Sequence, residues 1–117
     1  MRHQVKKNRL SRPRGQRRLL VGNLATSLIL HGKIQTTKAR AKAIQPVIDK
    51  LIITAKTKDR RIAIQTVGKI LQTEASSKIL FDKLVKKYQD RATGFTKISD
   101  IGFRAGDSAP LVQIELM

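Results

Sequence analysis

The first 48 residues of this chain contain no acidic side chain. Asp49 is the first acid, and twelve lysines and arginines precede it, eight of them within the first eighteen residues. A segment of this charge repels itself unless a polyanion neutralises it. Residues 49–117 hold 13 Lys and Arg against 8 Asp and Glu, a net charge of only +5. The cationic excess therefore lies at one end of the chain. A nucleic-acid backbone is the favoured partner, because phosphates neutralised by protein cations release their counterions.

Length and composition narrow the class of protein further. The 117 residues fit one domain, and a hydrophobic content of 40% supports a modest core. The absence of cysteine excludes disulfides and cysteine-based zinc sites. Aromatic residues make up only 3%, which argues against a surface that stacks unpaired bases. No apolar run approaches the roughly 20 residues of a membrane span, and the N-terminus lacks the pattern of a secretory signal, so we expect it to belong to the mature protein.

The first half of the chain predicts an arm, two helices and a strand. Residues 1–12 show no sustained apolar period and are expected to form a basic extended arm, followed by a single α+β RNA-binding domain over 13–117. Apolar residues recur every four positions over 14–31, which predicts a helix with Ser11 as its N-cap, Pro13 early in its first turn and Gly32 as its stop. Residues 33–37 are β-prone. A helix over 38–56 follows, capped by Thr36 or Thr37.

The second half predicts two more helices and two strands. Pro46 lies inside the 38–56 helix and predicts a kink or a break there. Asp59 can cap a helix over 60–71, and Thr73 can cap one reaching about residue 88. Residues 95–101 and 111–117 alternate in polarity as strands do, with a connection over 102–110. About four helices on one face of a small three-stranded sheet make an α+β fold.

No group of residues in this sequence has the spacing of a catalytic, metal-binding or cofactor-binding motif. The eight carboxylates are scattered, with no acid pair, no cysteine nucleophile and no triad pattern, so we expect no enzyme activity. His3 and His31 are the only histidines, and no third metal ligand lies at a sensible spacing. Residues 102–107 have the form GxxxGD, without the Lys-Ser/Thr and the helix of a phosphate-binding loop. A second basic cluster at a helix start joins Lys56 and Lys58 to Arg60 and Arg61. It is either a solvated helix end or a further contact surface, and the spacing does not show whether it faces the same side as the arm.

The motifs resemble a known family along the whole chain. In the first half, the motifs are the opening MRHQVKKNRL, RRLL at 17–20, NLATSL at 23–28, IQTT at 34–37, ARAK at 39–42 and PVIDKLI at 46–52. At the end of the chain they are GFTKI at 94–98, GFRAGDSAP at 102–110 and IEL at 114–116. Together they resemble the bacterial large-subunit ribosomal protein family number seventeen. The segment from about 62 to 77 matches least well.

The resemblance implies a fold, a location and partners. It implies an α+β fold with a small mixed sheet whose last strand lies between the other two. It also implies a structural constituent of the large subunit of a cytoplasmic ribosome, near the opening of the nascent-chain exit tunnel, with an organelle ribosome left open. The implied partners are large-subunit ribosomal RNA and neighbouring ribosomal proteins, with no membrane, no small-molecule substrate and no cofactor.

Charge and resemblance together assign RNA contacts by position. Cations at the start of a helix oppose its macrodipole, and a bound phosphate would resolve that conflict. The first-rank contacts are the cations and one histidine of the arm and first helix: Arg2, His3, Lys6, Lys7, Arg9, Arg12, Arg14, Arg17 and Arg18. The second-rank contacts are Lys38, Arg40, Lys42 and Arg104.

Two other functions use the same charges. A free DNA-binding or nucleoid-type protein would bind duplex DNA about as well as RNA, although no base-reading helix-turn-helix is evident. A membrane-surface protein would lay the amphipathic helix over 14–31 on anionic lipid, although no bulky aromatic residue anchors the apolar face of that helix. Vesicle co-sedimentation distinguishes the membrane case.

Overall fold

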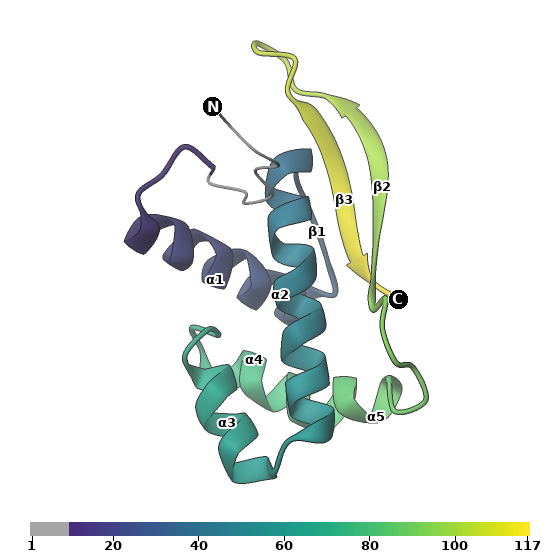
Figure 1. The fold of residues 1–117 in the computed structure, drawn as a ribbon. Coiled ribbons are helices and arrows are strands. Elements are labelled where there is room, and N and C mark those ends of the chain that lie inside the picture. The colour runs from purple at the N-terminus through teal and green to yellow at the C-terminus, as the bar shows by residue number, and fades with distance from the viewer. Residues whose placement is uncertain (1–9) are drawn as a thin grey trace, which may run out of the picture.

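The computed structural model describes residues 10–117, so most of the predicted arm lies outside the described residues. Within this range the chain runs from a helix through a short strand and a series of helices to a C-terminal β-hairpin (Figure 1). The helices gather on one side of the sheet, which confirms the predicted α+β fold. No helix of the described part has both the length and the apolar content needed to cross a membrane.

Helix α1 spans Arg14–His31 and is limited by a proline and a glycine. Pro13 occupies the N-cap position with an extended backbone and makes no side-chain capping bond. The predicted cap Ser11 was therefore wrong, because it lies two residues too early. Gly32 ends the helix as predicted, with a left-handed φ of 80° and its N–H donating to the Leu28 carbonyl at 2.8 Å. Glycine adopts this backbone conformation without the steric cost of a Cβ.

Helix α2 spans Lys38–Thr57 and continues through Pro46. Of the predicted kink or break at this proline, the break was wrong, because the helix is continuous. Pro46 is exposed, while Ile44 and Ile48 on the other side of the helix are buried. Water can therefore satisfy the carbonyl that loses its partner at Pro46, and burial of the apolar side holds the two halves of the helix together.

The next helices differ from the prediction in length and in regularity. Helix α3 spans Arg60–Gly68 and stops three residues earlier than predicted, at the glycine that weakens its last turn. Thr73 caps the following helix, and its side-chain oxygen accepts the Ser76 N–H at 3.3 Å. That helix is built from α4 (Glu74–Ile79), a wider π-helical stretch η1 (Leu80–Leu84) and α5 (Val85–Lys87). The apolar spacing predicted its extent and missed the π-helical stretch.

The sheet contains β1 (Lys33–Thr37), β2 (Thr96–Phe103) and β3 (Pro110–Leu116) in the order β1-β3-β2. The last strand lies in the middle, as the resemblance implied. The mixed sheet that it also implied was wrong, because both neighbours pair antiparallel with β3. A short connection over 104–109 joins β2 to β3 and enforces this direction for one pair. Strand β2 ends two residues later than predicted and β3 begins one residue earlier, so the connection covers 104–109 instead of the predicted 102–110.

The core lies between the helices and the inner face of the sheet. Val112 and Ile114 of β3 are fully buried on that face. The helices contribute most of the remaining aliphatic side chains, and Phe95, directly before β2, is the largest fully buried side chain. Buried members of this cluster include Leu28, Ile44, Ile48, Leu51, Ile52, Val67 and Leu80. This packing holds α1 and α2 in place, and the cationic side chains lie at the starts of these two helices.

Candidate nucleic-acid interface

The start of α1 concentrates positive charge that no described residue compensates. Arg14, Arg17 and Arg18 lie in its first two turns, no acid lies in the first turn, and no side chain caps the helix. The first helical hydrogen bond runs from the Arg17 N–H to the Pro13 carbonyl. The preceding N–H groups therefore point out of the helix end. Guanidinium charges, free N–H groups and the positive end of the macrodipole together favour an anion.

The same turns of α1 extend past the hydrophobic core. Gly22 is the first buried residue of this helix, and none of residues 14–21 is buried. Leu19 is 58% exposed in this stretch. In Figure 1 the purple beginning of α1 projects away from the other helices. Tertiary packing usually supplies most of a helix's stability, so a partner that packs on these turns would stabilise them.

The start of α2 repeats the pattern of α1. Lys38 and Arg40 lie in a first turn without acid, Thr37 makes no side-chain capping bond, and Lys42 follows directly. Lys38 and Lys42 are exposed, and Arg40 is half-buried. Two helices of this fold therefore begin with uncompensated cations.

An open groove runs between the first turns of α1, the middle of α2 and the turn after α3. Its rim includes the cations of α1 together with Lys69, which sequence analysis did not assign. No local pattern marks Lys69, because only the tertiary fold brings the turn after α3 beside α1. The lining residues are Arg14, Gly15, Arg17, Arg18, Leu19, Val21, Gly22, Ala43, Val47, Lys69, Ile70 and Gln72.

Arg12 is the one predicted contact of the arm that lies within the described residues. The Arg12 side chain is half-buried, and its Nη1 donates to the Leu10 carbonyl at 2.9 Å. The remaining first-rank residues lie outside the described residues: Arg2, His3, Lys6, Lys7 and Arg9.

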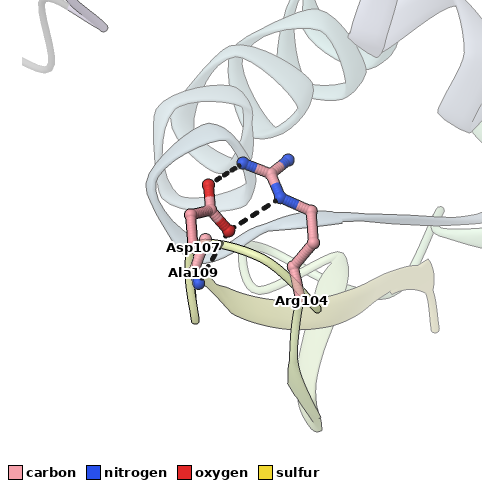
Figure 2. A network of polar contacts seen from close by, with 3 residues as sticks. All are labelled: Arg104, Asp107 and Ala109. Atoms are coloured by element: carbon pink, nitrogen blue, oxygen red, sulfur yellow. Dashed lines mark hydrogen bonds and ion pairs between the residues drawn. The ribbon is translucent and has the colours of Figure 1, made fainter.

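Arg104 differs from the other predicted contacts because a neighbouring carboxylate neutralises its charge. Its Nη2 and Nε donate to the two carboxylate oxygens of Asp107, at 2.6 Å and 3.1 Å (Figure 2). The hydrogen bond from Arg104 is the main cause that lowers the pKa of Asp107 from 3.8 to about 2, and the Ala109 N–H adds to it. Arg104 lies at the hairpin tip rather than on either helix start, so the fold does not bring it to the groove.

The second basic cluster does not act as one group. Lys56 donates to the Arg91 carbonyl at 2.5 Å and lies 5.6 Å from the centroid of the Phe95 ring, so it joins α2 to the segment before β2. Arg60 and Arg61 are exposed at the start of α3. Figure 1 places that start at the lower end of the molecule, away from the first turns of α1.

Among residues 10–117, no three His, Cys, Asp or Glu side chains lie together as a metal site would require. The exposed chemistry of the described residues is dominated by cations. Fold and charge together define a small, basic α+β protein with uncompensated cations at two helix starts.

Comparison with known proteins gives the family. Residues 20–117 match the family model described as Ribosomal protein L17. The chain is 39% identical over 117 residues to the large ribosomal subunit protein bL17 of Neorickettsia sennetsu, with all of both chains covered. It is 43% identical to the bL17 protein of Erythrobacter litoralis, covering 100% of this chain and 83% of the relative. The bL17 protein of a Thermoanaerobacter species is also 43% identical, with 93% and 96% covered. The chain belongs to the ribosomal protein L17 family, which confirms the resemblance found in the sequence.

Proposed function

We propose that this chain is a structural constituent of the large ribosomal subunit and binds large-subunit ribosomal RNA through its phosphates. The observation that supports this most directly is the pair of helix starts with uncompensated cations, one of which borders the open groove. Folded RNA offers the closely spaced phosphates that such a surface needs, and arginine can bind phosphate in a bidentate manner. Membership of the ribosomal family supports the same conclusion.

The proposed contacts form three groups and one separate residue, Arg104. Residues 1–12 form the RNA-binding arm, with Arg2, His3, Lys6, Lys7, Arg9 and Arg12 as contacts. Arg14, Arg17 and Arg18 at the start of α1 bind phosphates together with Lys69 across the groove. Lys38, Arg40 and Lys42 at the start of α2 extend this surface. Arg104 contributes least, because Asp107 already compensates its charge.

The helices and sheet of 13–117 act as the scaffold that holds these cations. The core fixes the directions of α1 and α2, so the charges are positioned before RNA binds, which lowers the entropic cost of binding. We propose no catalytic role, since a surface of this kind acts by neutralising and fixing RNA. The proposed place is the cytoplasmic ribosome, near the exit-tunnel opening and beside other ribosomal proteins. An organelle ribosome would use the same contacts.

The proposal predicts a preference for folded ribosomal RNA over duplex DNA. Purified full-length chain would be titrated against large-subunit ribosomal RNA fragments and against duplex DNA of matched length, at several salt concentrations. We expect tighter binding to the RNA and a steep linear fall of log affinity with log salt, because several phosphates are neutralised. Equal affinity for both polymers would contradict the proposal and favour a free DNA-binding protein.

A further inference from the structure

The tip of the β2–β3 hairpin has a different chemistry from the rest of the molecule. Residues 99–111 contain two carboxylates, Asp100 and Asp107, and one guanidinium, Arg104, so their net charge is −1 in a chain of net charge +17. The Arg104–Asp107 ion pair leaves Asp100 as the uncompensated charge of the tip, and its side chain is exposed. This region therefore attracts a phosphate backbone far less than the helix starts do.

The tip also exposes two large apolar side chains. Phe103 is 74% exposed and Ile101 is 49% exposed. Phe103 pairs with Pro110, and alternation along β3 places Pro110 on the same face as the buried Val112 and Ile114. The apolar face of the sheet thus continues past the helices that cover it. Figure 1 shows the hairpin extending beyond the upper end of α2.

The strands and the loop hold this apolar surface in one shape. The register shifts between Asp100 and Gly102, which leaves Ile101 in a bulge. Bulges commonly redirect side chains at the edge of a sheet. In the loop, the Arg104 N–H donates to the Ala109 carbonyl at 2.9 Å, and the Ser108 N–H donates to the Arg104 carbonyl at 3.0 Å. With the Arg104–Asp107 pair, these bonds preorganise the tip and reduce the cost of ordering it in a complex.

We infer that the hairpin tip, residues 99–111, is a docking surface for another protein, one that presents an apolar pocket flanked by lysine or arginine. Phe103 would enter the pocket and Asp100 would pair with the flanking cation. Sites where an aromatic side chain stacks on a nucleotide base combine stacking with a positively charged groove. Here the guanidinium of Arg104, the residue that follows Phe103, is neutralised by Asp107. This inference rests on the proposed function, because the partner with such a pocket would be a basic protein that neighbours this chain in the large subunit.

Site-specific photocrosslinking tests the inference. A photoreactive phenylalanine analogue would replace Phe103 in the full-length chain, large subunits would be purified and irradiated, and products would be identified by mass spectrometry. We expect position 103 to crosslink to one defined protein at a site rich in lysine or arginine. The same analogue at Arg18 serves as the matched control and should crosslink to RNA. Crosslinks from position 103 to RNA or to residues 1–9 of the same chain, or the absence of any crosslink, would overturn the inference.

Failure of the proposed function has a different signature. In that case the chain would be absent from purified large subunits and position 18 would give no RNA product.

A second experiment places the analogue at Ile101 and adds Asp100→Lys, which should lower the yield of the protein crosslink several-fold by like-charge repulsion. Lys97→Ala, on the same strand but before the tip, should leave the yield unchanged. An equal yield with Asp100→Lys would contradict the charge pairing that the inference requires.

Discussion

Gly22 of α1 lies directly against the backbone of Ile70, in the turn that follows α3. A Cβ atom at Gly22 would lie 2.8 Å from the Ile70 carbonyl oxygen and 3.0 Å from Nε2 of the Gln72 side chain. The Thr26 hydroxyl, one turn further along α1, accepts the Gln72 N–H at 3.1 Å. This close approach brings Lys69 to the groove beside the arginines of α1, so a missing side chain in one helix determines the shape of the cationic surface.

Substituting Gly22→Ala should destabilise the fold. The new methyl group meets a backbone carbonyl, which cannot rotate away, so α1 or the turn must shift at a cost of about 1–3 kcal/mol in the free energy of unfolding. Gly15→Ala is the matched control, because Gly15 lies in the same helix with nothing within 4 Å of the added atom. Helix propensity should make that variant neutral or more stable by up to about 1 kcal/mol. Urea unfolding measures both, and equal stability of the two variants would contradict the packing described.

Replacing Arg17 and Arg18 with alanine should weaken RNA binding in a salt-dependent way. Each lost phosphate contact removes about one unit from the slope of log affinity against log salt, so the double variant should flatten it by about one to two units. Titrations with ribosomal RNA fragments at several salt concentrations give the slope.

The Arg60→Ala, Arg61→Ala double variant is the charge-matched control for this experiment. These residues are exposed beside Asp59 at the start of α3, away from the groove. Their removal should change the slope much less. If both pairs flatten the slope equally, binding depends on total charge and the assignment to the start of α1 is wrong.

The capping bond of Thr73 should be visible in stability. Its Oγ1 accepts the Ser76 N–H at 3.3 Å and donates to the Ser76 hydroxyl at 3.0 Å. Thr73→Ala should therefore lower the free energy of unfolding by about 1 kcal/mol. Asp59 occupies the same N-cap position of α3 without a side-chain bond. Asp59→Ala should cost only the interaction with the helix dipole, a few tenths of a kcal/mol. A larger loss for Asp59→Ala would contradict this assignment of the caps.

Tyr88 should make the fold sensitive to high pH. Burial raises the pKa of its phenol above 10.0, and the nearby charge of Arg91 only partly opposes this. Its hydroxyl donates to the Met117 carbonyl at 2.5 Å, a bond that the phenolate cannot donate. The unfolded chain therefore loses this proton first, and stability that is complete below pH 10 falls as pH rises through the folded-state pKa.

Ultraviolet titration can follow this group alone, because Tyr88 is the single tyrosine and the chain has no tryptophan. The midpoint should lie above 10.0 in the folded protein and return to the ordinary value in concentrated urea. Tyr88→Phe should cost about 1 kcal/mol through loss of the hydrogen bond and should remove the stability change above pH 10 that this group causes. Identical midpoints in the folded and unfolded chain would contradict the buried position.

Apolar spacing predicted the helices well, because each helix buries one stripe against a common core. Leu28 in α1 and Ile48 in α2 are examples of such stripe residues, and both are fully buried. Local sequence signals were less reliable where tertiary packing determines the backbone conformation. Pro46 does not interrupt α2, because its exposed side faces water while the opposite side is held by the core. The π-helical stretch from Leu80 to Leu84 has no counterpart in the apolar period.

The charged surface was predictable only in part. The charge count located the cations of α1 and α2, because these follow from position in the sequence. It could not find Lys69, which joins the groove only through the contact between Gly22 and Ile70. Nor could it show that Asp107 neutralises Arg104, since that ion pair depends on the turn of the hairpin loop.

The most direct test of the central claim is sedimentation of a cell lysate through a sucrose gradient, with the chain traced by immunoblot before and after a high-salt wash. A built-in constituent of the large subunit should migrate with that subunit and remain there after the wash, because many phosphate contacts and the surrounding assembly hold it. Migration at the top of the gradient, or release by a mild wash, would contradict the claim and favour the free DNA-binding alternative.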